Sequence, residues 1–195
     1  HHAGHDAVRL AAGLQLVDPA EPSGLVPALR DEVRQTIAAL RTTLWTLKHP
    51  PRTAADLGHH LDRYVRDQAR LHPSVILSAG LHGLTDRDLP PLGTLHLFRI
   101  AQEALSNALR HANARRIVVA FEEAPDGMLT LSVRDDGRFR PANDSGQGLL
   151  SMHARAVEID AEFRLTPSDT GTEVAVMWKP TDSSERTMRG RRANA

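Results

Sequence analysis

Five polar side chains of residues 99–114 fall on one side of an expected helix. Glu103, Asn107 and His111 follow one another at intervals of four residues, so on a helix they lie almost above one another, with a drift of roughly 40° per step. Arg99 and Arg110 stand beside them. This set can hold a divalent cation and a polyphosphate and position a proton acceptor. We therefore expect the stripe to contact a nucleotide, although His111 could instead interact with the dipole at the helix C-terminus.

A second cluster stands at the end of an expected strand, where Asp135 is followed two residues later by Gly137. A carboxylate at this point can accept a hydrogen bond from the exocyclic amine of a purine, and the glycine lets a ligand approach the backbone. Asp-Gly after a strand is also an ordinary turn sequence. Taken alone, the cluster leaves both interpretations open.

Glycines also open an expected helix further along the chain, in Gly146-Gln147-Gly148-Leu149. The free N–H groups at a helix start, together with the helix dipole, favour an anion, and glycines permit close contact. The alternative is a flexible loop that meets a helix cap. Thr172, directly after Gly171, could add a hydroxyl near the same ligand or simply belong to a turn.

The elements that must position these residues follow from hydrophobic periodicity. The pattern predicts an N-terminal helical hairpin and then an α+β layer domain. Helices are expected at residues 5–17, 25–49, 53–71, 91–111 and 149–159, and strands at 74–78, 116–122, 128–134, 162–166 and 172–178. Thr53 is the expected N-cap of the third helix, with Asp56 in the capping-box position. Residues 181–195 read as a basic tail.

Composition excludes several classes of protein. Hydrophobic residues make up 41% of the 195 residues and aromatic residues only 4%, which predicts a real but aliphatic core. With no cysteine, disulfides, zinc-thiolate sites and thiol catalysis are excluded. Lys+Arg and Asp+Glu are 24 each, so no overall charge favours nucleic acid. No apolar run approaches the roughly 20 residues of a membrane helix, so no membrane segment is expected in this fragment.

The order of these clusters resembles the ATP-binding domain of the GHKL superfamily (gyrase, Hsp90, histidine kinase, MutL), in particular sensor histidine kinases of the NarX/DesK type. Arg99–Ala114 is similar to their N box, Asp135–Gly137 to the G1 box, Gly146–Gly148 to the G2 box and Gly171–Thr172 to the terminal Gly-Thr element. The resemblance covers about residues 89–180, and more weakly 25–71. It implies a Bergerat-type α/β sandwich that binds ATP and Mg²⁺.

The resemblance implies a role for each matching residue. Asn107 corresponds to the Mg²⁺ ligand, Glu103 to the N-box acid that can polarise the attacking group, and Asp135 to the aspartate that reads adenine. The other ATP-binding positions that it implies are Arg110, His111, Gly137, Gly146, Gln147, Gly148, Leu149 and Thr172. One departure is Phe139, which stands where the G1 box usually has its second glycine.

The expected phosphoacceptor is His5, because His5-Asp6 resembles the His-Asp pair of this family. Asp6 could accept the second N–H of the imidazole and make it a better nucleophile. The alternative is an N-terminal histidine beside a purification tag. The implied domains are a dimerisation and phosphoacceptor region at 1–71, an ATP-binding catalytic domain at 72–180 and a flexible tail at 181–195.

A sensor histidine kinase core of this type implies a homodimer, a response regulator of the NarL/LuxR type as partner, and a cytoplasmic location. It would phosphorylate its own histidine with Mg-ATP and pass the phosphoryl group to the regulator. Two alternatives stay open: an anti-sigma-type serine kinase of the same superfamily, and a non-catalytic dimerisation module that senses ATP.

Overall fold

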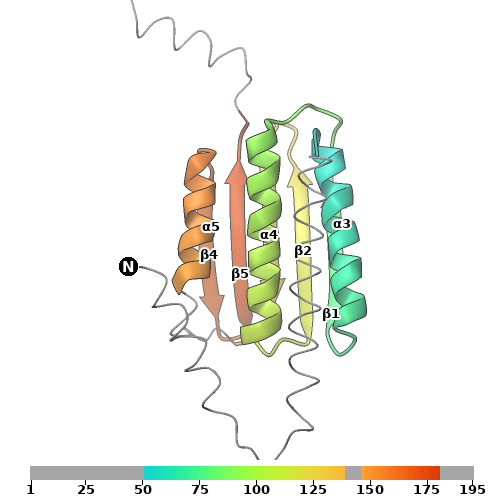
Figure 1. The fold of residues 1–195 in the computed structure, drawn as a ribbon, viewed down its shortest axis with the longest axis vertical. Coiled ribbons are helices and arrows are strands. Elements are labelled where there is room, and N and C mark those ends of the chain that lie inside the picture. Colours follow the sequence, from blue (N-terminus) through green and yellow to red (C-terminus); the bar gives the residue numbers. More distant parts are fainter. Residues whose placement is uncertain (1–50, 139–145, 181–195) are drawn as a thin grey trace, which may run out of the picture. The chain divides into compact units, whose positions relative to one another are not determined.

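The computed structural model describes residues 51–138 and 146–180 (Figure 1). His5, Asp6, the expected helices at 5–17 and 25–49 and the basic tail lie outside the described residues. So does Phe139. None of the helices in the described ranges is long and apolar enough to cross a membrane.

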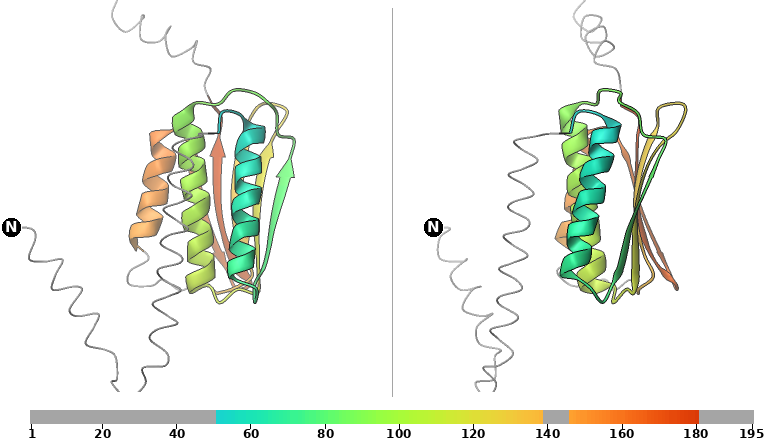
Figure 2. Two further views of the ribbon diagram at one scale, coloured as in Figure 1. Left: turned by 45° about the vertical axis from the view of Figure 1, so that its right-hand side comes forward. Right: turned by 90° about the vertical axis from the view of Figure 1, so that its right-hand side faces the viewer.

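In the described ranges, three helices cover one face of a five-stranded sheet, as the edge-on view in Figure 2 shows. The strand order is β1-β2-β3-β5-β4, with β1 parallel to β2 and the other neighbours antiparallel. The elements in chain order are α3 (Ala54–Leu71), β1 (Ile76–His82), α4 (Pro91–His111), β2 (Arg116–Glu123), β3 (Leu129–Asp135), α5 (Gly146–Glu158), β4 (Glu162–Ser168) and β5 (Gly171–Trp178). The α/β layer part of the expected fold is therefore confirmed.

Two elements differ most from the sequence expectation, and the other boundaries agree to within two residues. The strand expected at 74–78 is β1, which starts later and extends to His82 because its pairing with β2 continues to Glu122. The helix expected from residue 149 begins at Gly146. Glycine is tolerated there because the first N–H groups of a helix have no intrahelical partner to lose.

The core lies between the helices and the sheet and is mostly aliphatic, as composition predicts, with Phe98, Phe121 and Trp178 as its buried aromatic residues. Alternate residues of β2 and β3 point toward the helices and are buried, and α4 packs its apolar stripe over them. The central members are Leu97, Ile100, Ala104, Leu105, Ile117, Val119, Phe121, Leu129, Leu131 and Val133. α4 can lie this close to β5 because residue 93 is glycine: a Cβ there would lie 2.0 Å from the Trp178 ring.

Helix α3 begins as its capping sequence predicts. The Thr53 hydroxyl accepts a hydrogen bond from the Asp56 N–H at 3.1 Å, and Asp56 Oδ2 accepts one from the Arg52 N–H at 3.3 Å. The helix buries Leu57 and Leu61. Residues 54–71, expected as part of the helical N-terminal region, pack against β1, β2 and α4.

Candidate functional site

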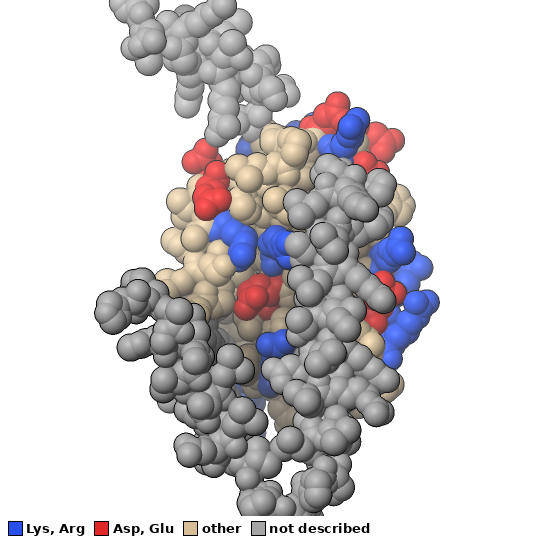
Figure 3. Space-filling view, in the orientation of Figure 1, with Lys and Arg blue, Asp and Glu red and all other residues tan. Residues whose placement is uncertain are grey.

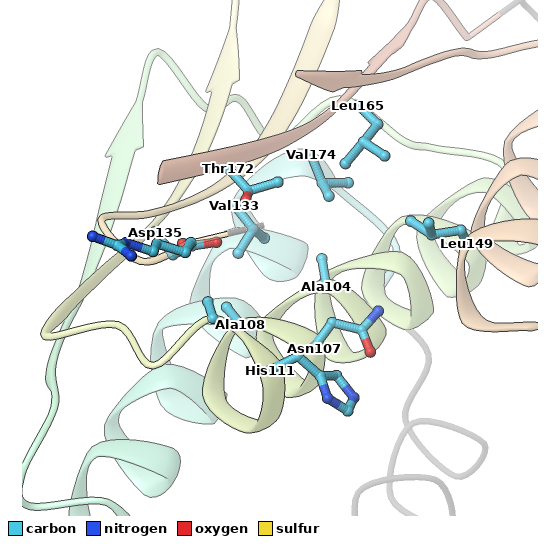
Figure 4. Close-up of a pocket in the computed structure, with 12 residues that line it drawn as sticks. Ala104, Asn107, Ala108, His111, Val133, Asp135, Leu149, Leu165, Thr172 and Val174 are labelled. Atoms are coloured by element: carbon cyan, nitrogen blue, oxygen red, sulfur yellow. The ribbon is translucent and has the colours of Figure 1, made fainter. Parts of the chain in front are cut away.

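One pocket brings together side chains from α4, the ends of β3 and β5, β4 and the first turn of α5 (Figure 4). It is an open cleft with about 530 Å³ of empty space, a volume that includes the solvent at its mouth. Its lining residues are Ala104, Asn107, Ala108, His111, Ala112, Val133, Asp135, Arg138, Leu149, Leu165, Thr172 and Val174. Five of them were candidates from sequence: Asn107, His111, Asp135, Leu149 and Thr172.

Sequence reasoning missed the apolar wall of the pocket. Val133 and Val174 are direct partners in the β3–β5 ladder, and Leu165 is paired with Val174 in the β4–β5 ladder. Ala104 and Ala108 of α4 lie opposite these residues (Figure 4). The small alanines leave open the space between helix and sheet that a planar ligand would need. In the sequence, the spacing of alanines on the apolar side of α4 could have indicated this apolar wall.

Asp135 is a buried carboxylate at the end of β3, with only 8% of its surface exposed. Its Oδ1 accepts a hydrogen bond from the Gly137 N–H at 2.8 Å. Burial raises the pKa of Asp135, the backbone hydrogen bonds from Gly137 and Thr172 oppose the increase, and the neighbouring Asp136 adds to it. A carboxylate has acceptor capacity beyond one N–H, so Asp135 can accept a further donor from a ligand in the pocket.

Two glycines allow the backbone segments around Asp135 to pack closely. At Gly171, where φ is +147°, a Cβ would lie 1.9 Å from the carbonyl oxygen of Asp135, so β5 can start beside the end of β3 only without a side chain. At Gly137, a Cβ would lie 2.1 Å from the carbonyl oxygen of Ala112. The same carbonyl accepts the Arg138 N–H at 2.9 Å. The loop after β3 is thereby tied to the end of α4.

The polar stripe of α4 forms the other side of the site. Glu103 and Asn107 are half-buried, and His111 is exposed at the pocket mouth. The start of α5 lies directly on this stripe: a Cβ at Gly148 would be 2.4 Å from Glu103 Oε1 and 3.4 Å from Asn107 Nδ2. Glu103 and Gly148 therefore lie at the rim of the pocket, next to Asn107.

The remaining sequence candidates lie outside the pocket lining. Gly137 acts on the site through Asp135, and Arg110 and Gln147 are exposed. Gly146 is the first residue of α5. On the helix-covered face, the described Lys and Arg side chains alternate with Asp and Glu rather than forming one basic patch (Figure 3).

The donor set fits a magnesium ion that arrives with a polyphosphate. Among the described residues, no group of three or more His, Asp or Glu side chains could hold a metal by itself. Asn107 places one amide group in the pocket, with Glu103 one turn away. Mg²⁺ prefers hard oxygen ligands, keeps several waters and commonly takes only one or two protein ligands together with substrate phosphates.

A family model matches residues 93–183, the part of the chain that contains the pocket. The family is described as histidine kinase-, DNA gyrase B-, and HSP90-like ATPase. Curated relatives include the sensor protein VraS of Staphylococcus haemolyticus and of Staphylococcus aureus. Each is 30% identical over 155 residues, which are 77% of this chain and 43% of the relative. The chain thus spans less than half the length of these relatives.

Solved structures share the fold. The histidine kinase domain of the Erythrobacter litoralis EL346 blue-light activated histidine kinase aligns with a TM-score of 0.53 and 24% identity, over 64% of this chain and 61% of that one. The histidine kinase AdeS of Acinetobacter baumannii aligns with a TM-score of 0.53 and 14% identity, over 90% and 93%. Residues 93–183 are therefore a histidine kinase-type ATPase domain, with the α/β sandwich fold of the GHKL group.

Proposed function

We propose that this chain is the kinase core of a sensor histidine kinase. It binds Mg-ATP, transfers the γ-phosphoryl group to a histidine of its own and passes it to a response regulator. The observation that carries the proposal is the pocket itself. One end has the buried Asp135 between apolar walls, and the other has Asn107 beside Glu103 and the start of α5.

This arrangement supports one orientation of ATP. The adenine lies between Val133, Val174 and the alanines of α4, and its exocyclic amine donates to Asp135. Thr172 stands beside that contact. The triphosphate runs along α4 toward Asn107 and His111, where the N-terminal end of the α5 dipole favours an anion.

Phosphoryl transfer requires positioning and charge stabilisation more than covalent chemistry. Mg²⁺, with Asn107 as its protein ligand, would neutralise charge on the phosphate oxygens. A histidine nitrogen forms a bond to the γ-phosphorus while the bond to the β–γ bridging oxygen breaks, and ADP leaves. Glu103, at the rim next to Asn107, polarises the attacking imidazole. We assign the acceptor to His5, with Asp6 taking the proton from the other ring nitrogen.

The same proposal extends to the rest of the protein. The chain would act as a homodimer of the NarX/DesK type, on the cytoplasmic side, as part of a larger sensor. Residues 1–71 would carry dimerisation and the phosphoacceptor, with α3 packed against the catalytic domain at residues 72–180, and residues 181–195 would be a basic tail. The partner would be a response regulator of the NarL/LuxR type. The similarity to VraS sensor proteins supports this reading.

A labelling assay tests the function. Incubation with Mg²⁺ and γ-labelled ATP should give a protein label that is stable in alkali and lost in acid, and His5→Gln should not label. Full labelling of His5→Gln would reject His5 as the acceptor. ATP binding without any labelling would favour the non-catalytic ATP-sensing module, and acid-stable label on a serine of a second protein would favour the anti-sigma-type kinase.

Gly148→Ala should impair transfer more than ATP binding. The added methyl group would lie 2.4 Å from Glu103 Oε1 and would push this flexible carboxylate aside, while its contact with Asn107 at 3.4 Å is ordinary. We expect the labelling rate to fall roughly tenfold with little change in ATP affinity, because misplacing a reacting group costs rate. Gly80→Ala is the control, since a Cβ there meets nothing closer than 3.6 Å. An unchanged labelling rate in Gly148→Ala would contradict the assigned role of Glu103.

A further inference from the structure

The two edges of the sheet differ in how they are protected against a further strand. At one edge, β4 carries Glu162, Arg164 and Pro167, and charges and prolines of this kind hinder the addition of a strand. At the other edge, beside α3, β1 has the sequence Ile-Leu-Ser-Ala-Gly-Leu-His, without a Lys, Arg, Asp, Glu or Pro residue (Figure 2). Among the described residues, no strand pairs with β1 on the side away from β2. β1 is therefore an open edge.

Alternate residues of β1 turn their backbone groups toward this open edge. The Ile76 N–H donates to the Arg115 carbonyl at 2.8 Å, so the backbone groups of Ile76 face β2. In a parallel ladder every second residue does the same. The N–H and C=O groups of Leu77, Ala79 and Leu81 therefore point away from β2, where a further strand would meet them.

β1 is complementary to itself in the antiparallel direction. If a two-fold axis relates two copies at Ala79, the two Ala79 residues lie opposite each other, and Leu77 of one copy lies opposite Leu81 of the other. Each of these pairs can exchange two hydrogen bonds. Ile76, which is 59% exposed, would lie opposite His82 of the second copy and be covered. In this register no carboxylates, ammonium groups or guanidinium groups of the two strands oppose each other.

Helix α3 adds charge complementarity above the same edge. A Cβ at Gly58 would lie 3.5 Å from Cδ1 of Leu81, so this side of α3 lies over β1. Asp62 and Arg66 follow Gly58 at intervals of four residues and continue along that side. Arg66 Nε donates to Asp62 Oδ1 at 3.2 Å, and both side chains reach solvent. The two-fold axis would set α3 antiparallel to its copy, so that the long Arg66 side chain could reach Asp62 of the second copy.

We propose that β1 and α3 form a self-association surface, on which a second copy of this chain pairs its β1 with β1 in the antiparallel direction and continues the sheet. This inference goes beyond the kinase function proposed above and does not depend on it. Two strands of seven residues bury well under the roughly 1,200 Å² of a stable interface, and exposed ion pairs between the helices add little. The association is therefore weak and depends on protein concentration.

Hydrogen exchange of the outward N–H groups tests the pairing directly. The N–H groups of Leu77, Ala79 and Leu81 should exchange roughly tenfold more slowly at high protein concentration than at low concentration, because pairing protects them. The N–H groups of β4 that point away from β5 are the control and should exchange at the same rate at both concentrations. If the β1 groups also keep one rate, the edge stays unpaired and the proposal is wrong.

Cysteine cross-linking tests the register, because the chain has no cysteine of its own. Ser78 of one copy would face Gly80 of the other in a pair without hydrogen bonds, with Cα atoms about 4.5 Å apart, within reach of a disulfide. A mixture of Ser78→Cys and Gly80→Cys should form a covalent dimer containing one of each on mild oxidation. A Cβ at Gly80 meets nothing closer than 3.6 Å, so this variant should fold.

The single variants are the control for this cross-link. Each variant alone places its two cysteines about 7–8 Å apart on the diagonal, so it should link poorly. No covalent dimer in the mixture, or equal cross-linking of a single variant, would contradict the proposed register.

Ala79→Pro should abolish the association. Proline removes the N–H that points toward the open edge and no hydrogen bond to β2, and edge strands tolerate it there. In sedimentation, the mass of the parent should rise with concentration and that of Ala79→Pro should not, while circular dichroism confirms that the variant is folded. A dimer held by residues 1–71 would persist in both proteins. If folded Ala79→Pro associates like the parent, the contact lies elsewhere and the proposal is rejected; if the variant does not fold, hydrogen exchange and cross-linking decide.

Discussion

The Asp135→Asn substitution should lower the affinity for ATP about a hundredfold, which corresponds to a loss of binding free energy on the order of 3 kcal/mol. Asparagine can still accept the Gly137 N–H through its one carbonyl oxygen, as Asp135 Oδ1 does now at 2.8 Å. The NH₂ group of asparagine then takes the place of the second carboxylate oxygen. It is a hydrogen-bond donor, so it cannot accept a hydrogen bond from the amine of the ligand. Titration of the variant with ATP, followed calorimetrically, measures the loss.

The same change should leave the fold equally stable or more stable. The pKa of Asp135 is raised by burial, so its ionised form is disfavoured in the folded state. The sign follows from linkage: the contribution of Asp135 is fully present below the unfolded pKa of 3.8 and is lost as pH rises through the folded value. At neutral pH the native carboxylate therefore costs stability, and the amide removes that cost. Urea unfolding at neutral pH tests it.

Asp136→Asn is the matched control at the next residue. Asp136 is exposed, and its Oδ1 accepts the N–H groups of Arg115 and Arg116 at 2.7 and 2.9 Å, which lowers its pKa. Its contribution to stability is present at neutral pH and is lost as pH falls through the folded pKa. Asp136→Asn should thus bind ATP normally and unfold more easily. Equal ATP affinity in Asp135→Asn and Asp136→Asn would exclude Asp135 as the adenine acceptor.

Asn107→Asp should lower the labelling rate by at least about a hundredfold, the effect typical of removing a key electrostatic group. Aspartate keeps the size and one carbonyl-type oxygen, but it adds a negative charge one turn from Glu103 and beside the proposed triphosphate. The repulsion should misplace the phosphates even where Mg²⁺ still binds. Initial labelling rates at several Mg²⁺ concentrations give the measurement.

The control for Asn107→Asp is the same substitution six residues later. Asn113 is exposed, follows the end of α4 and has a φ of 50°, which aspartate also tolerates. Asn113→Asp adds the same charge to the same region and should label like the parent. If Asn107→Asp also labels like the parent, Asn107 holds no cation and the proposed orientation of the triphosphate is incorrect.

Local periodicity explains why the site helix could be predicted from sequence. Residues 91–111 were expected as a helix, and α4 spans Pro91–His111. Asn107 and His111 are four residues apart on this helix, so their spacing alone places them on the same side of it, which in the structure faces the pocket. Strand boundaries were predicted to within a few residues for the same reason, since alternation is also a local property.

The parts that could not be predicted depend on long-range register. Leu165 and Val133 reach the pocket wall only because β5 lies between β3 and β4, an order that no local pattern contains. The apolar wall of the pocket is thus less visible in the sequence than the polar stripe of α4.

The residues proposed to bind the two ends of the nucleotide are both fixed relative to α4. The loop that presents Asp135 is tied to α4 through the Ala112 carbonyl, and Asn107 belongs to α4 itself. The described pocket residues all fall between residues 104 and 174, so the binding module is contiguous in the chain. Such a unit can be exchanged between proteins in a single recombination event with its ligand geometry intact.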